Sequence, residues 1–261
     1  MIESLNSPHI ARVKALIGSR GAKERRSAGE FVAEGMQCFR EAINSSNGPQ
    51  MTTLYLTQLA RLKLNETIDL SRLPIFDVSD DVMREMSQTI TPQGILAICS
   101  IPRKRLEDIK LNGGRRFIYL SQVQDPGNAG TILRSADAFG MDAVITSPGS
   151  VDMYSPKVVR STAGSLWHIP IFESVELSTL ISNMPLQAFT LTANATQRLE
   201  DFIVTSDCLA IFGNEARGLS IEESIPNIES VTIPMTGSAE SLNLSVAASI
   251  VMYHLSNMRT S

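Results

Sequence analysis

Short apolar runs alternate with longer amphipathic segments throughout the second half of the chain. Strands are predicted at 117–121, 143–146, 169–172, 188–192, 208–212 and 231–234. Helices are predicted after about residue 128 to Phe139, at 157–166, and at the end of the chain. The last helix has apolar residues at helical spacing, namely Leu244, Ala247, Ala248, Val251, Met252 and Leu255. This alternation predicts an α/β fold with a parallel sheet.

The first half shows a similar alternation. Strands are predicted at 31–34, 53–56, 75–78 and 94–101, and helices at 9–17, 36–44, 58–64 and from the Ser79 cap to Met86. The polar segment 18–29 is predicted to be a loop. The pattern indicates a smaller α/β domain with a mostly parallel sheet.

A charged stretch at 101–114, which ends in a glycine pair, has the composition of a linker. We therefore predict domains at 1–100 and 115–261. No apolar run reaches the roughly 18 residues of a membrane span, and the first residues do not resemble a secretory signal. The three cysteines fit no disulfide framework or zinc spacing, which favours buried thiols in a reducing cytoplasm.

Charge is distributed unevenly around a net value of −4. Residues 1–112 carry 15 basic and 13 acidic side chains, and the first 26 residues are markedly basic. A local basic patch can bind phosphate on an acidic protein. The candidate RNA-binding residues are Arg12, Lys14, Arg25 and Arg26, and the alternative is an ordinary solvated helix face.

Residues 125–140 follow a predicted buried strand. Pro126 and Gly127 predict a turn, and Asn128 can cap the next helix. Arg134 shares a helix face with Thr131 and could hold an RNA phosphate in bidentate fashion. Taken alone, it could equally be a surface arginine.

Two further segments also follow predicted strands. In residues 211–220, Gly213 would let a ligand approach the backbone, and Glu215 is a candidate functional carboxylate or simply a solvated one. In residues 233–249, a loop of small residues precedes Asn243, a normal helix cap. Such a loop can wrap an adenine and its ribose, and Thr192 and Ala193 offer a further wall. The sequence contains no Gly-x-Gly-x-x-Gly fingerprint, P-loop, Ser/His/Asp arrangement or metal-ligand cluster.

Taken together and in this order, the three segments closely resemble the motifs of the SpoU (TrmH-like) RNA ribose methyltransferases. The resemblance covers about residues 113–258. It implies a parallel sheet with helices on both faces, a deep trefoil knot at the C-terminal end, a homodimer formed through the catalytic domain, and S-adenosylmethionine as cofactor without a metal. The implied cofactor residues are Gly213, Ile233, Leu242, Thr192 and Ala193, and the implied catalytic residues are Arg134, Asn128, Glu215 and Asn243.

Residues 1–100 resemble, less closely, the family's L30-like substrate-binding domain. The implied reaction is methyl transfer to a ribose 2′-hydroxyl, with ribosomal RNA favoured over tRNA. Within it, Arg134 is either the base, as usually proposed for the family, or a group that orients phosphate and stabilises alkoxide charge. An arginine stays charged at physiological pH, which favours the second role.

Other interpretations remain open from the sequence. The chain could be a tRNA methyltransferase of the same family, an enzyme that confers antibiotic resistance, a non-catalytic RNA-binding or ribosome-assembly factor, or an ordinary nucleotide-binding α/β protein. Binding of S-adenosylmethionine separates the enzymes from the last two.

Overall fold

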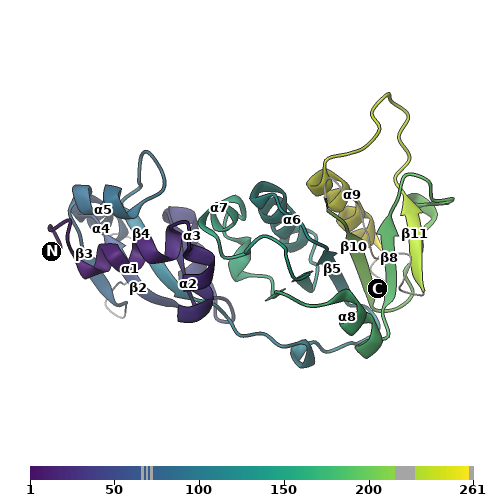
Figure 1. The fold of residues 1–261 in the computed structure, drawn as a ribbon, viewed down its shortest axis with the longest axis horizontal. Helices are drawn as coiled ribbons and strands as arrows, with labels where there is room; N and C mark the ends of the chain where they lie inside the picture. Colours follow the sequence, from purple (N-terminus) through teal and green to yellow (C-terminus); the bar gives the residue numbers. More distant parts are fainter. Residues whose placement is uncertain (66–67, 69, 71–72, 215–226, 259–261) are drawn as a thin grey trace. The chain divides into compact units, whose positions relative to one another are not determined.

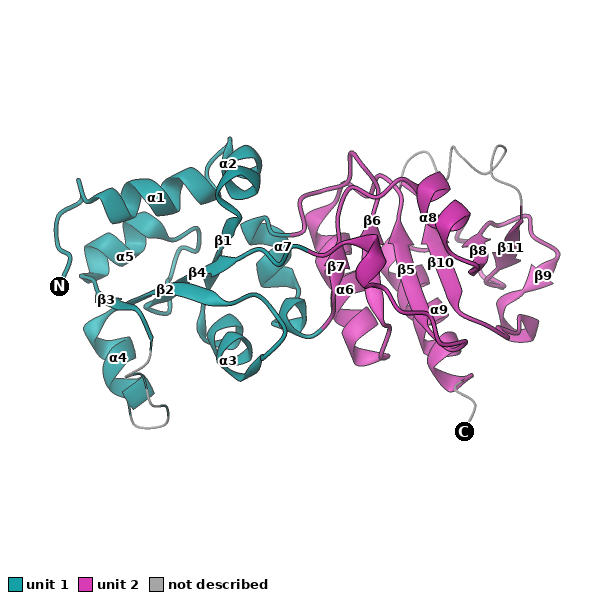
Figure 2. Cartoon of the chain, turned by 90° about the horizontal axis from the view of Figure 1, so that it is seen from below, with its two compact units in different colours: residues 1–103, 154–168 teal, residues 104–153, 169–261 magenta. Residues whose placement is uncertain are grey.

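Two compact units make up the chain (Figures 1 and 2). The computed structural model describes residues 1–65, 68, 70, 73–214 and 227–258. Unit 1 comprises residues 1–103 and 154–168, and unit 2 comprises residues 104–153 and 169–261. The division after residue 103 falls within the segment predicted as a linker, but the predicted domains do not include the return of 154–168 to unit 1.

Unit 1 contains a four-stranded sheet in the order β1-β4-β2-β3. The strands are β1 (Glu30–Glu34), β2 (Met51–Leu56), β3 (Ile75–Asp77) and β4 (Ile95–Ser100). β4 runs antiparallel to both β1 and β2, and only β2 and β3 are parallel. The prediction of a mostly parallel sheet is therefore wrong. Alternation of helices and strands does not fix strand direction, and the loop at 87–94 returns the chain into the sheet in the opposite sense.

In residues 1–103 the helices packed around this sheet are α1 (Pro8–Ile17), α2 (Gly21–Ala28), α3 (Met36–Asn44), α4 (Gln58–Asn65) and α5 (Asp80–Met86). Ser7 caps α1. Ser79 caps α5, as the sequence predicted. Helix α2 occupies the segment predicted as a loop. It lacks an apolar stripe, and its inward contact is made by Arg25, whose guanidinium donates to the carbonyl oxygen of Leu16.

The segment that returns to unit 1 carries α7 (Pro156–Ser161) and a 3₁₀ turn, η2 (Ser165–Trp167). The Phe31 ring lies 5.1 Å from the ring of Tyr154 and 6.0 Å from that of Trp167. The indole Nε1 of Trp167 donates to the carbonyl oxygen of Pro49 at 3.0 Å. These buried contacts make the segment part of the unit 1 core.

Unit 2 contains a seven-stranded sheet in the order β7-β6-β5-β10-β8-β11-β9, and all of its pairs are parallel. The strands are β5 (Arg116–Leu120), β6 (Ala143–Thr146), β7 (Ile171–Phe172), β8 (Gln187–Leu191), β9 (Gln197–Arg198), β10 (Cys208–Phe212) and β11 (Ile228–Thr232). The predicted parallel sheet is confirmed. The trefoil knot stays a prediction.

Helices cover both faces of this sheet (Figure 2). α6 (Pro126–Ala138) and α9 (Leu244–Asn257) pack together on one face, and α8 (Leu177–Asn183) packs on the other. Leu177 and Leu180 of α8 join a buried cluster with Tyr119, Ile145 and Ile211. Among the helices of the described residues, none combines the length and apolar composition that a bilayer crossing requires.

The carboxylate of Asp207 binds the backbone segment that leads into β5. It accepts hydrogen bonds from the backbone amides of Asn112 (3.4 Å), Gly113 (3.0 Å) and Arg115 (2.6 Å). Burial opposes ionisation of this carboxyl, but the amide hydrogen bonds outweigh burial and lower its pKa below the ordinary value. The end of the predicted linker is therefore fixed to the sheet.

Candidate functional site

Four adjacent parallel strands end at one edge of the unit 2 sheet. In spatial order they are β5, β10, β8 and β11. The segments that leave them carry α6, Gly213, Thr192 and Ile233, respectively. Open α/β sheets bind ligands at the carboxyl ends of their strands. The three segments singled out in the sequence, and the predicted wall at Thr192, therefore meet at the edge where a ligand site is expected.

Helix α6 begins directly beyond β5. Asp125 is its cap, accepting a hydrogen bond from the backbone amide of Asn128 at 2.7 Å, and Pro126 opens the first turn. The prediction that Asn128 caps this helix is wrong, because a proline at the first helical position makes the preceding residue the cap. The signal was present in the sequence as an acidic residue directly before the proline.

The side chain of Asn128 instead contacts Asn243. The Nδ2 of Asn243 donates to the Oδ1 of Asn128 at 3.1 Å. Asn243 also caps α9, since its Oδ1 accepts from the backbone amides of Ser245 (2.9 Å) and Val246 (3.4 Å). The Asn243 side chain thus caps α9 and joins its start to the first turn of α6.

A second contact supports this helix pair. The hydroxyls of Ser135 on α6 and Ser249 on α9 lie 2.8 Å apart. The amide-bearing, partially positive ends of both helices therefore face the same edge of the sheet, where an anionic or electron-rich group would be stabilised.

Arg134 is exposed on α6, as is Thr131, one helical turn earlier. Within the described part of the chain, its guanidinium forms neither an ion pair nor a hydrogen bond with protein, so it can take an external anion. Glu215, its predicted companion, lies outside the described residues.

The loop between β5 and α6 is tied to the end of β10. The Nδ2 of Asn214 donates to the carbonyl oxygen of Gln122 at 2.8 Å, and the amide of Gln122 donates to the Oγ of Ser147 at the same distance. Gln122 has a φ of 51°, an uncommon value for a residue with a side chain. This brace was not predicted, and only the position of Asn214 directly after Gly213 hinted at it.

A cavity of about 190 Å³ opens beside these strand ends. Four of the five predicted cofactor residues line it: Thr192, Ala193, Ile233 and Leu242. Gly213 does not line it, although it follows the neighbouring strand β10. The other lining residues, which were not predicted as part of the site, are Leu191, Thr232, Met235, Glu240, Ser241 and Ala247.

The cavity suits a flat, weakly polar ring system flanked by hydroxyl groups. Leucine, isoleucine and alanine residues form much of its lining, together with Thr192 and Thr232 at the strand ends. Glu240 and Ser241 add polar atoms at the loop side. An adenosine moiety offers a matching combination of an apolar ring face and polar edges.

The predicted RNA-binding residues of unit 1 are in different environments. Arg12 pairs with Glu30 at 2.7 Å, and Lys14 pairs with Glu85, both near the surface. Arg26 is exposed. Arg25 is only 4% exposed and bonds to the Leu16 carbonyl oxygen, so the structure contradicts its prediction as an RNA contact.

Comparison with known proteins agrees with this geometry. Residues 115–253, more than half of the chain, match the SpoU rRNA Methylase family. The chain belongs to this family. Residues 8–97 of this SpoU protein match the MRM3-like substrate binding domain.

Similar proteins include two named ribosomal RNA enzymes. A Bacillus subtilis protein named 23S rRNA (guanosine(2553)-2'-O)-methyltransferase RlmP is 32% identical over 237 residues, covering 89% of this chain and 91% of that protein. A Streptomyces viridochromogenes protein named 23S rRNA (uridine(2479)-2'-O)-methyltransferase is 30% identical, covering 95% and 89%, respectively.

Solved structures show the same fold over the whole chain. The AdoMet-bound rRNA methyltransferase of Sinorhizobium meliloti superposes with a TM-score of 0.86 at 26% identity, covering 100% of this chain and 98% of that one. AviRb of Streptomyces viridochromogenes, a SpoU methyltransferase in complex with AdoMet, superposes with a TM-score of 0.83 at 27% identity, covering 97% and 98%.

Proposed function

We propose that this SpoU protein methylates a ribose 2′-hydroxyl of ribosomal RNA with S-adenosylmethionine as methyl donor. The observation that carries the proposal is the meeting of the first turns of α6 and α9, joined by the Asn128–Asn243 hydrogen bond, with a cavity of about 190 Å³ at one sheet edge. The family match, and relatives named as 23S rRNA 2′-O-methyltransferases, support the reaction and the RNA class.

Thr192, Ala193, Ile233 and Leu242 would hold the adenosine part of the cofactor, and Gly213 would leave room beside β10 for the remainder. When bound, S-adenosylmethionine supplies an electrophilic methyl group on a sulfonium. The protein must then position the 2′-hydroxyl and manage the proton that it loses.

Arg134 is proposed to hold the RNA phosphate next to the target ribose. A guanidinium is planar, permanently charged and able to bind phosphate through two hydrogen bonds. It would also stabilise negative charge that develops on the 2′-oxygen. We favour this role over that of a base, and the proton would pass to a nearby acceptor or to water.

The two asparagines are proposed to position the hydroxyl and to shape the cofactor loop. Their hydrogen bond fixes the amide groups relative to each other, so neither must be ordered when substrate binds. Glu215 is proposed to orient Arg134 or the ribose.

Unit 1 is proposed to bind the RNA around the target. Arg12, Lys14 and Arg26 are exposed enough to contact phosphate. Arg12 and Lys14 would release their carboxylate partners and bind phosphate instead. Arg25 is left out because it is buried. The name of the matching domain supports this division of labour.

The protein is also proposed to form a homodimer through α9. Val246, Ile250 and Tyr253 are 47%, 37% and 58% exposed there. They line an apolar groove of about 330 Å³ together with Thr131, Ser245 and Ser249. A second copy would bury these side chains. Light scattering of the purified chain should give twice the mass of the monomer, and Tyr253→Glu should return it to the monomer.

Ribosomal RNA is preferred over tRNA because the named relatives that match almost the whole chain act on ribosomal RNA. The three free, buried cysteines fit work in the reducing cytoplasm, where ribosomes are made.

Calorimetry with S-adenosylmethionine and mapping of ribose methylation in cellular RNA, with and without the gene, test the proposal. We expect saturable binding and one lost 2′-O-methyl mark in ribosomal RNA. Absence of binding at near-millimolar cofactor would reject the enzyme, and a mark lost only from tRNA would reassign its substrate.

A further inference from the structure

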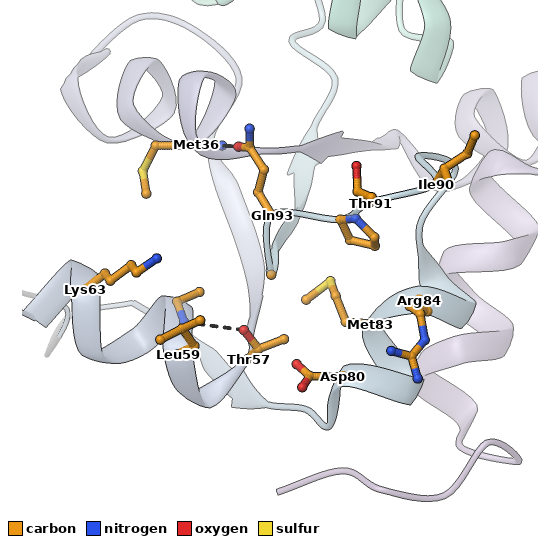
Figure 3. A pocket seen from close by; sticks show the side chains of 13 residues that line it. Met36, Thr57, Leu59, Lys63, Asp80, Met83, Arg84, Ile90, Thr91 and Gln93 are labelled. Carbon is orange, nitrogen blue, oxygen red and sulfur yellow. Dashed lines mark hydrogen bonds between the residues drawn. The ribbon is translucent and has the colours of Figure 1, made fainter.

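A second, larger cavity lies in unit 1, within the part that matches a substrate-binding domain (Figure 3). Its volume is about 670 Å³. Its walls come from the start of α3, from α4 and α5, and from the loop 87–94 that precedes β4. The lining residues are Met36, Thr57, Leu59, Ala60, Lys63, Asp80, Met83, Arg84, Ile90, Thr91, Pro92, Gln93 and Gly94.

The loop that forms one wall is held in place at both ends. The Thr89 hydroxyl donates to the carboxylate of Glu34, and the Oε1 of Gln93 accepts from the amide of Met36 at 2.7 Å. The backbone amide of Thr57 donates to the carbonyl oxygen of Gly94 at 3.0 Å. The wall is thus preorganised, so a ligand need not order it on binding.

The apolar tip of this anchored loop faces water. Ile90 is 98% exposed at the cavity rim, and Leu59 across the cavity is 62% exposed (Figure 3). An isoleucine that is fixed in place and almost wholly in solvent is a surface on which the flat face of an unpaired base can rest. Apolar side chains of this kind commonly contact bases in protein–nucleic acid complexes.

The polar groups of the cavity complement the remaining parts of a nucleotide. Lys63 and Arg84 approach from opposite sides and can bind phosphate, while Asp80 lies between them (Figure 3). Arg84 pairs with Asp81, but in the described part of the chain neither Lys63 nor Asp80 has a side-chain partner. A carboxylate accepts hydrogen bonds from an exocyclic amino group, which cytosine has and uracil lacks.

We propose that this cavity binds an unpaired nucleotide of the substrate RNA and prefers a base with an amino group. The base rests on Leu59, Asp80 accepts from its amino group, Lys63 holds the phosphate, and Ile90 at the opposite rim contacts the neighbouring nucleotide. The inference rests on the proposed function for the identity of the ligand as RNA, and it adds a base-reading site within unit 1.

Methyl NMR of the full-length protein tests where RNA binds. Isoleucine, leucine and methionine methyls are labelled, and a cytidine hexamer and a uridine hexamer are titrated separately. We expect the signals of Ile90, Leu59 and Met83 to shift, while that of Leu62 stays in place. We also expect the cytidine hexamer to bind at least about fivefold more tightly than the uridine hexamer, as one amino-group contact would give.

Two exposed leucines of α4 provide a matched pair of variants. Leu59 lines the cavity, whereas Leu62 is 59% exposed and does not. Leu59→Asp should weaken binding of the cytidine hexamer and of a 23S rRNA transcript at least about fivefold. Leu62→Asp should leave both unchanged. Asp80→Asn should remove most of the cytidine preference while leaving the thermal stability of unit 1 similar.

Calorimetry with S-adenosylmethionine on the same variants separates this inference from the proposed function. Normal cofactor binding and methylation, with no cavity signal moved by either hexamer, would overturn the inference alone. Equal effects of Leu59→Asp and Leu62→Asp would do the same. A Leu59→Asp variant that binds RNA normally but fails only on ribosomal particles would assign the cavity to a protein partner. Loss of cofactor binding by the unsubstituted protein would instead reject the proposed enzyme.

Discussion

Arg134 is the residue on which the two chemical roles can be separated. Lysine keeps the positive charge but loses the planar fork and can give up its proton at high pH. If Arg134 orients phosphate, Arg134→Lys should lower kcat at least about tenfold at every pH from 7 to 10. A tritiated-methyl transfer assay on ribosomal RNA across this range measures it.

A base role would give a different profile. Activity of Arg134→Lys would then climb with pH toward that of the unsubstituted enzyme as the lysine deprotonates, near pH 10.4 for an ordinary lysine. Affinity for S-adenosylmethionine serves as the control, and it should be unchanged in either case because Arg134 does not line the cofactor cavity.

The three cysteines give a second prediction at the residue scale. All are free and buried, as expected from their spacing, and burial raises the pKa of Cys38 to about 11 and that of Cys208 to about 12. At pH 8 the thiolate fraction of Cys38 falls about 100-fold below that of an ordinary thiol. Ellman's reagent should therefore label the native protein slowly and label three thiols at once after denaturation.

The same shifts affect stability in a defined direction. Because the folded state keeps these thiols protonated, the unfolded state releases protons first as the pH rises. The cysteine contribution to the free energy of unfolding is therefore complete below about pH 9 and is lost progressively above it. Rapid labelling of a single cysteine at pH 8 in the folded protein would contradict the buried arrangement.

At the scale of elements, the α6–α9 pair depends on both halves of one amide. Asn243→Asp keeps an oxygen that can cap α9 but replaces the nitrogen that donates to Asn128. Asn243→Ala removes the cap as well. We expect the alanine variant to lose about 1 kcal/mol of stability and the aspartate variant to lose little, while both lose most of their methylation activity.

Ser79→Ala is the matched control for this pair. Ser79 also caps a helix through its side chain, but that helix lies in unit 1. Its loss should lower stability by a similar amount without a comparable loss of kcat. Urea denaturation and single-turnover methylation measure the two effects, and full activity of Asn243→Asp would show that the contact with Asn128 is only structural.

An element could be predicted from the sequence where its stabilising contacts are local, and not where they join distant parts of the chain. Strands β5, β6, β8 and β10 and the Ser79 cap are local signals and were predicted to within one residue, whereas β9 was missed and the prediction for β11 began three residues late. Helix α2 was missed because it has no apolar stripe. Its inward contact is made by the buried Arg25, whose guanidinium donates to the carbonyl oxygen of Leu16 in the preceding helix. The direction of β4 was missed because pairing between distant strands leaves no periodic signal.

The candidate site shows the same division. Asn128, Asn243, Ile233 and Leu242 were predicted from segments that resemble family motifs, and Thr192 and Ala193 were predicted because they follow a strand. The hydrogen bond between Asn128 and Asn243 joins residues far apart in the chain, and the Gln122–Asn214 brace joins two loops. Neither contact can be inferred from spacing, because both depend on which strands become neighbours in the sheet.

At the scale of the whole molecule, unit 1 is built from two separate stretches of the chain, because residues 154–168 return to it from within the sequence of unit 2. Trp167 is the single tryptophan of the chain and is buried in unit 1. Its fluorescence therefore reports the unfolding of unit 1, although it is encoded within the stretch that matches the SpoU family.

A fragment of residues 1–103 should consequently be unstable by itself, because Phe31 and the carbonyl oxygen of Pro49 lose their partners. Joining residues 154–168 to it through a flexible glycine–serine linker should restore cooperative unfolding. We expect the joined fragment to be about 3 to 5 kcal/mol more stable, the range for removing a buried aromatic side chain. Urea denaturation followed by far-UV circular dichroism compares the fragments. The joined fragment with Trp167→Ala should fall most of the way back to the short one, whereas equal stability of all three would mean that the segment only rests on unit 1 without stabilising it.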